Sequence, residues 1–329
     1  MAARLHGVVH HAGPLAGRDA PGVVRSDPRL PAARTALRQR DRVISRNLVV
    51  RIAFAVPAIA VALVVVWYGG WVLAALLGGL GVLGAREVYD FARRQGIVPL
   101  SALGYVGAAT IPFAAFWAKQ SELHWAEPLV FLSALWLIAV LVAALVFRGP
   151  DRRPLTAVAV TVFGCLYASA LIAFIVPIRH GTHSDAHPLA STALVGLPLV
   201  VTWTCDTCAM TAGAVFGGPK LTPVLSPHKT WAGAIGGVIG ALVAALAYGP
   251  LVLDRVALHL GTPRLIVVGL TVAIAAQVGD AAESLLKREA GVKDSSSLIP
   301  GHGGMLDRLD SLYFVVPVSA GLFRLFGVV

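Results

Sequence analysis

Acidic and basic residues of this chain gather near its C-terminal end. Six of its 17 aspartates and glutamates fall between residues 280 and 310. The stretch also carries five basic residues, namely Lys287, Arg288, Lys293, His302 and Arg308. Asp280, Glu283, Ser284 and Lys287 follow one another at positions i, i+3, i+4 and i+7, which places them on one face of a helix. Carboxylates are the hard oxygen ligands that Mg²⁺ requires.

A glycine-rich segment follows this helix face. Residues 298–304 read Leu-Ile-Pro-Gly-His-Gly-Gly and lie between flanking acids and bases. Glycines let backbone amides approach a phosphate closely, and the basic side chains add positive charge. A metal held by carboxylates beside such an anion cradle predicts phosphoryl-type transfer.

A second group of polar residues precedes the apolar run 231–253. Ser226 and Lys229 would lie near the start of a helix, where unpaired amides favour an anion, and Thr230 could cap that helix. Asp206 falls inside another apolar run, with no lysine or arginine nearby in sequence. Because an unpaired buried carboxylate is costly, we expect it to meet a metal ion or a cation from another helix.

The elements that must position these residues are membrane helices. The chain is 57% hydrophobic and 13% charged, with a mean hydropathy of +0.77, whereas soluble domains carry about 25% charged residues. Apolar runs of about 16–25 residues predict an all-α polytopic integral membrane protein with nine spans. The spans are expected near residues 49–68, 70–85, 101–118, 128–147, 156–178, 189–216, 231–253, 264–286 and 311–328. The sixth is overlong, so we expect it to be broken, tilted or partly outside the bilayer.

The distribution of charge predicts the orientation. Residues 1–46 hold nine arginines against three aspartates and no long apolar run, which indicates a disordered basic cytoplasmic arm that is not a cleaved signal peptide and does not bind nucleic acid. Basic residues also gather in the loops after spans two, four, six and eight. The positive-inside rule then places the N-terminus and residues 287–310 in the cytoplasm. We divide the rest into N-terminal transmembrane helices, 47–200, and a catalytic transmembrane region, 201–329.

The C-terminal motifs resemble a known family. The run Gly279 to Arg288, then Lys293-Asp294, the segment 298–304 and Leu306 to Ser311 are similar to the signature of phosphatidate cytidylyltransferases, also called CDP-diacylglycerol synthases. A second family motif resembles Lys220-Leu221, Ser226-Pro227 and Lys229 to Trp231. The likeness is strong from about Thr202 onward and weak over the first five spans. Ala214, Gly218 and Ala232 stand where the family often has charged residues.

This resemblance implies an activity and a set of roles. The reaction would join CTP and phosphatidate to give CDP-diacylglycerol and pyrophosphate, at the cytoplasmic face of the plasma membrane. Mg²⁺, with a second monovalent or divalent cation as an option, would be held by Asp280, Asp307, Asp206 and Asp310. Catalytic or phosphate-binding roles would fall to Lys287, Arg288, Lys293, Asp294, His302 and Arg308. Further substrate contacts would come from Lys220, Ser226, Lys229, Ser284, Gly303 and Gly304. A homodimer is compatible with this assignment.

Two other functions are compatible with charged residues inside the membrane. A cation-coupled transporter would use Asp206, Asp280 and Glu283 as an ion path, but it leaves the glycine-histidine segment unexplained and no internal repeat is visible. Another lipid nucleotidyltransferase or phosphotransferase is the second alternative. The enzymes that use a CDP-alcohol share an aspartate-rich pattern that this sequence lacks.

Overall fold

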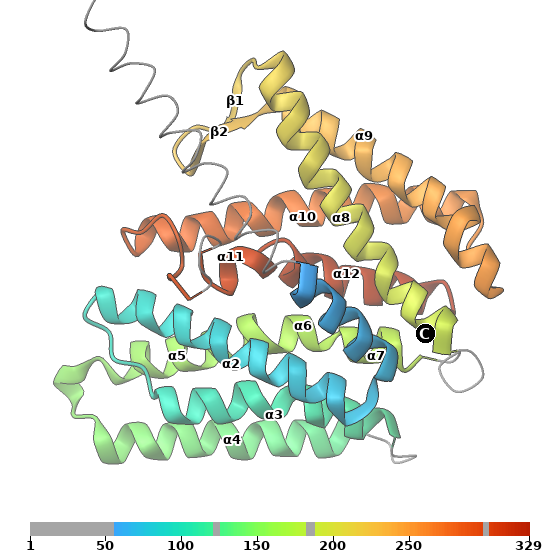
Figure 1. The fold of residues 1–329 in the computed structure, drawn as a ribbon. Helices are drawn as coiled ribbons and strands as arrows, with labels where there is room; N and C mark the ends of the chain where they lie inside the picture. The colour runs from blue at the N-terminus through green and yellow to red at the C-terminus, as the bar shows by residue number, and fades with distance from the viewer. Residues whose placement is uncertain (1–55, 121–125, 182–187, 299–302) are drawn as a thin grey trace, which may run out of the picture. The chain divides into compact units, whose positions relative to one another are not determined.

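The computed structural model describes residues 56–120, 126–181, 188–298 and 303–329. The chain divides into two units, Met1–Leu48 and Val49–Val329, and all of these residues belong to the second. The predicted arm, residues 1–46, and His302 therefore lie outside the described residues. Figure 1 shows the helices of the second unit.

Seven helical segments in the described ranges are long and apolar enough to cross a membrane, and they correspond to the second to eighth predicted spans. They comprise α2 (Gly70–Arg94), α3 (Ser101–Gln120), α4 (Ala126–Phe147), the α5 to α7 segment (Pro154–Arg179), α8 (Pro188–Phe216), α9 with its continuation (Trp231–Val256) and α10 (Thr262–Glu289). At 1.5 Å per residue, α10 extends about 42 Å, which exceeds the roughly 30 Å of a bilayer's hydrocarbon core. The chain is a membrane protein.

The ninth predicted span is shorter in the structure, and the first lies partly outside the described residues. The helix Val56–Tyr68 covers 13 of the 20 residues expected for the first. α11 (Leu306–Leu309) and α12 (Leu312–Leu325) occupy the end of the chain, and the 14 residues of α12 extend only about 21 Å. The structure therefore confirms the helical membrane architecture without confirming the count of nine.

Two stretches differ locally from the sequence expectation. α8 is one continuous helix of 29 residues with Pro198 inside it, so the sixth span is not broken, and the alternatives of a tilt or of an extension beyond the bilayer stay predictions. Residues 220–230 form the only strands among the described residues, an antiparallel hairpin of β1 (Lys220–Thr222) and β2 (Ser226–Thr230). Lys220 pairs with Thr230 and Thr222 with Ser226. Ser226 and Lys229 are therefore strand residues that precede α9, and Thr230 caps that helix by accepting a hydrogen bond from the Gly233 amide at 3.1 Å.

Small residues bring α8 and α9 close together. A Cβ atom at Gly240 would lie 2.5 Å from Sγ of Cys208, and one at Gly237 would lie 3.1 Å from Sγ of Cys205. Membrane helices use such small residues because they let two backbones approach. Both cysteines are free, so packing of α8 against α9 accounts for the C-x-x-C spacing.

α10 connects the two halves of this helical assembly. It packs against α8 and α9 on one side and against α12 on another, while α2 packs against α3 and α5 (Pro154–Cys165). The buried core includes the large side chains of Tyr89, Tyr313 and Phe323. The C-terminal part of α10, which carries the acidic face, is thereby held between the hairpin and α11.

Candidate active site

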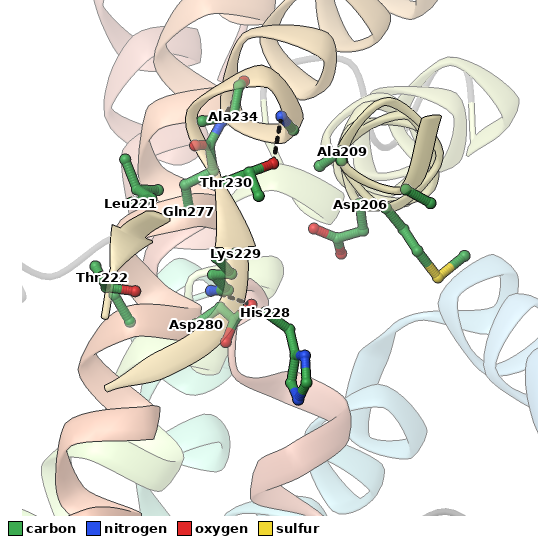
Figure 2. Close-up of a pocket in the computed structure, with 15 residues that line it drawn as sticks. Asp206, Ala209, Leu221, Thr222, His228, Lys229, Thr230, Ala234, Gln277 and Asp280 are labelled. Carbon is green, nitrogen blue, oxygen red and sulfur yellow. Dashed lines mark hydrogen bonds and ion pairs between the residues drawn. The ribbon is translucent and has the colours of Figure 1, made fainter. Parts of the chain in front are cut away.

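A cavity of about 440 Å³ opens between α8, α9, α10 and the hairpin. Small side chains of the three helices make most of its wall, and its polar lining comes from Asp206, Thr222, His228, Lys229, Thr230, Gln277 and Asp280. Figure 2 shows Asp206 projecting from α8 toward the hairpin and α10. Polar groups from three separate parts of the chain therefore converge on one space.

An ion pair between Lys229 and Asp280 lines this cavity. Nζ of Lys229, on β2, lies 2.5 Å from Oδ2 of Asp280, on α10, and the two side chains are 29% and 32% exposed. Oδ1 of Asp280 accepts a long hydrogen bond of 3.4 Å from Ser284. Because both charged groups stay accessible, a ligand entering the cavity can reach them.

Lys287 lies seven residues after Asp280 on α10, and it bridges two other carboxylates. Its ammonium group pairs with Oε2 of the buried Glu283 and lies 2.7 Å from Oδ1 of Asp307. The predicted helix face is therefore real, and its lysine is held by acids on α10 and α11. Its positive charge is largely balanced within the protein.

Asp307 is the most heavily bonded of the predicted metal ligands. Its Oδ2 accepts hydrogen bonds of 2.8 Å from the amide and hydroxyl of Ser295 and from the amide of Gly304. Burial alone would raise the pKa of Asp307, but the bonds from Lys287, Gly304 and Ser295 outweigh it and hold that pKa below its usual value. Asp307 thus stays ionised at neutral pH. Gly303 has a φ of +79°, and a Cβ there would lie 2.5 Å from Oδ2 of Asp307, so this turn requires glycine.

Asp310 lies in a more negative environment. Burial, and then the charge of Asp280, raise the pKa of the Asp310 carboxyl to about 6, against the influence of the Ser311 amide, Lys287 and Lys229. Asp206 interacts electrostatically with the same charges, being repelled by Asp310 and Asp280 and attracted by Lys229. The five carboxylates here (Asp206, Asp280, Glu283, Asp307 and Asp310) face only two lysines in ion pairs within the described residues. This excess of negative charge suits a cation.

Comparison with known proteins identifies the family. Residues 49–326 match the model of the cytidylyltransferase family. The chain belongs to this family. It is 35% identical over 269 residues to the phosphatidate cytidylyltransferase of Haemophilus influenzae, an alignment that covers 73% of this chain and 86% of that protein. It is 36% identical over 200 residues to the Thermotoga maritima phosphatidate cytidylyltransferase, covering 60% and 71% of the two chains. The Brucella suis enzyme of the same name is 46% identical over 144 residues, which cover 43% of this chain and 49% of that one.

The family match confirms the resemblance seen in the motifs and extends it over the N-terminal helices. It covers the first five spans, where the sequence alone offered only a weak likeness. Neither the transporter nor the alternative lipid transferase gains support from these relatives. The cytidylyltransferase fold therefore includes α2 to α7 as well as the helices that line the cavity.

The donor set fits Mg²⁺ in part. No group of three or more histidine, cysteine or acidic side chains in the described ranges stands ready to hold a metal ion. Mg²⁺, however, is usually bound through one or two carboxylates, with water and substrate phosphates as its other ligands. Asp206 and Asp310 form no ion pair with lysine or arginine among the described residues, and Oδ1 of Asp280 makes only the long bond to Ser284. These oxygens are the better candidates, since Asp307 is bonded by Lys287 and by the amides of Ser295 and Gly304, and it shares the Ser295 hydroxyl with Glu87.

Asp206 differs from the expectation of a buried acid. Its side chain is exposed within the cavity. Asp206 shares the cavity face of α8 with Ala209 and Met210, and this face turns toward Lys229 and Asp280. No cation from another helix pairs with Asp206 among the described residues; the lysine that attracts it electrostatically, Lys229, lies on the hairpin and is paired with Asp280.

The remaining predicted residues do not line the cavity. Arg288 donates to the carbonyl oxygens of Leu225 at 3.2 Å and Val292 at 3.0 Å, so it ties the end of α10 to the hairpin. Four of the other predicted residues are exposed, namely Lys220, Lys293, Asp294 and Arg308. Ser226 is half-buried in β2. Substrate contacts for these residues stay predictions.

Three polar residues near the site were missed by sequence reasoning. Gln277 lines the cavity and donates from Nε2 to the Ala234 carbonyl at 3.1 Å, which joins α10 to α9. His228 lines the hairpin side. Glu87 lies on α2, in residues 86–94, which were expected to form a loop but continue the helix to Arg94. The sequence did offer one signal for Glu87: its spacing places it on the same helix face as the apolar residues of span two, which indicates a buried carboxylate.

Proposed function

We propose that this chain is a phosphatidate cytidylyltransferase. An oxygen of the phosphatidate phosphate would attack the α-phosphorus of CTP, the bond to the β-phosphate would break, and pyrophosphate would leave as CDP-diacylglycerol forms. The observation that carries this proposal is the Lys229–Asp280 pair, which faces Asp206 across an accessible cavity in a chain of the cytidylyltransferase family. The attacking phosphate is already anionic near neutral pH, so no general base is required.

The chain's own residues would bind and orient two anionic substrates. Lys229 would exchange Asp280 for a substrate phosphate, because its ammonium group is accessible and its ion pair is not sealed from the cavity. The half-buried Lys287 would supply positive potential while it keeps Glu283 and Asp307 in place. Positive charge arranged in advance around developing negative charge is a major source of catalysis.

Mg²⁺ would be held by Asp280 with Asp206 and Asp310, and Asp307 is proposed as a further ligand or as the anchor of Lys287. When bound, the ion would neutralise phosphate charge and steady the pyrophosphate. A second cation and a homodimer stay predictions. The substrate pair, an amphiphile and a soluble nucleotide, suits a site at a membrane surface, and we propose that this surface is the cytoplasmic face of the plasma membrane.

The test is a reconstituted assay. Protein purified in detergent is supplied with CTP, phosphatidate and Mg²⁺, and release of pyrophosphate and formation of CDP-diacylglycerol are both measured. We expect turnover that requires all three, with diacylglycerol unable to replace phosphatidate. Pyrophosphate release that does not depend on phosphatidate, or its complete absence in correctly folded protein, would overturn the proposal.

A further inference from the structure

Glu87 makes a set of contacts that sequence motifs did not suggest. It lies on α2 and is 3% exposed. Its Oε1 accepts hydrogen bonds from the Ser296 hydroxyl at 2.6 Å and the Met305 amide at 2.9 Å. Its Oε2 accepts from the Ser295 hydroxyl and the Leu306 amide, both at 2.8 Å. One carboxylate therefore joins two segments that lie more than 200 residues away in sequence.

These four bonds have a consequence for local order. All four donors are neutral, two hydroxyls and two backbone amides, and bonds to an ionised acceptor are roughly twice as strong as those between neutral groups. A buried acceptor that loses a partner keeps its full desolvation penalty. Residues 295–296 and 305–306 are thus held at a set separation by one side chain from the other half of the protein.

The same residues bind Asp307. The Ser295 hydroxyl lies 2.8 Å from Oε2 of Glu87 and 2.8 Å from Oδ2 of Asp307. A hydroxyl has one proton, so it can donate fully to only one of the two carboxylates at a time. Gly304 lies against Ser295 and Glu87, since a Cβ atom at this position would collide with both side chains. The position of Asp307, and with it that of Lys287, therefore depends on where Glu87 holds this turn.

We propose that Glu87 is a positioning residue of the active site. It holds Ser295 and the start of α11 in place, so that Asp307 keeps the ammonium group of Lys287 beside Glu283. Glu87 is not among the residues that line the cavity. The effect on turnover rests on the proposed function, whereas the effect on local order does not.

The first test uses Glu87→Gln. Glutamine keeps the shape of the side chain but replaces one acceptor oxygen with an NH₂ group, which must then face a backbone amide of Met305 or Leu306. We expect kcat to fall by about tenfold to a hundredfold with KM for CTP within about threefold, because the substrate contacts themselves remain. We also expect hydrogen exchange of the amides at 304–307 to accelerate by at least about tenfold, with the amides of α9 unchanged.

Asp90→Asn is the matched control. Asp90 lies on the same helix, but its carboxylate is 43% exposed and pairs only with Arg93, three residues along. This variant should resemble wild type in kcat and in exchange. A second variant, Ser296→Ala, removes one donor and leaves Oε1 bonded to Met305, so it should fold normally and lower kcat by a few-fold.

The outcomes separate this proposal from the proposed function. If wild-type protein shows no phosphatidate-dependent turnover, the proposed cytidylyltransferase function is refuted. Hydrogen exchange at residues 304–307 would still test whether Glu87 orders this part of the chain. Unchanged kcat and unchanged exchange at 304–307 in Glu87→Gln would overturn the positioning role. If Glu87→Gln does not fold, the same unchanged values in Ser296→Ala would overturn it.

Discussion

Nζ of Lys229 lies 2.5 Å from Oδ2 of Asp280, so a strand residue and a helix residue that are 51 positions apart in sequence meet through one ion pair. Both residues line the cavity between α8, α9, α10 and the hairpin. Each partner has a candidate ligand of opposite charge in the proposed reaction, a phosphate for the lysine and a cation for the aspartate. Substituting Lys229 and Asp280 one at a time therefore tests the phosphate-binding role and the cation-binding role separately.

Removing the charge of Asp280 should abolish turnover. Asp280→Asn keeps the shape of the side chain but loses the oxygen charge that a metal ion and Lys229 both require, and we expect kcat/KM to fall at least about a hundredfold. Added Mg²⁺ should restore part of the activity if the carboxylate binds the ion. The exposed Asp254→Asn is the matched control, measured in the same pyrophosphate assay. Activity within about threefold of wild type for Asp280→Asn would contradict the assignment.

Asp307→Asn should affect stability as well as activity. The asparagine NH₂ group would face Lys287 or the donors at Ser295 and Gly304, and the half-buried Lys287 would lose one of its two carboxylate partners. We therefore expect a lower Tm than in Asp280→Asn, together with a loss of turnover, measured by thermal unfolding in detergent and by the assay. A Tm equal to that of wild type would show that the bonds to Asp307 contribute nothing to folding.

Two lysines of the hairpin should respond differently to substitution. Lys229 lines the cavity, whereas Lys220 is exposed at the start of β1. Lys229→Gln should lower kcat/KM by about a hundredfold, because loss of a charge that contacts phosphate weakens both binding and transition-state stabilisation. Lys220→Gln should stay within about threefold. Equal losses in the two variants would show that the hairpin acts through its overall charge rather than through the cavity.

The orientation of the site in the membrane can be tested by cysteine labelling. Ser297 is exposed beyond the C-terminal end of α10, and Thr262 is exposed at its first residue. An impermeant thiol reagent applied to sealed cells should label Thr262→Cys and not Ser297→Cys, because residues 287–310 are expected in the cytoplasm. Permeabilised cells should show labelling of both. The reverse pattern in sealed cells would refute the proposed orientation.

The N-terminal arm should be dispensable for chemistry. Residues 1–46 combine high net charge with no apolar periodicity, a composition that cannot bury a core. A chain that begins at residue 47 should retain turnover in detergent within a few-fold of the full chain. A loss of about a hundredfold or more in folded protein would place the arm in the active site.

Sequence alone determined the helical membrane architecture and the family, since both depend on local signals. Long apolar runs predict spans because a bilayer forces each backbone polar group to be satisfied within its own helix. The face of Asp280, Glu283, Ser284 and Lys287 follows from helical geometry alone, and the structure shows its internal contacts. The cap at Thr230 is local for the same reason.

Tertiary structure decided which of these polar groups meet. No spacing rule could pair Lys229 with Asp280, place Asp206 opposite them, or distinguish Lys229 from Lys220, because those relations arise from the packing of α8, α9 and α10 through their small residues. The bonds from Glu87 to residues 295–296 and 305–306 were equally hidden, since they cross more than 200 residues of sequence. Periodicity reports which face of one helix is polar, whereas contact between distant segments depends on how all the helices pack together.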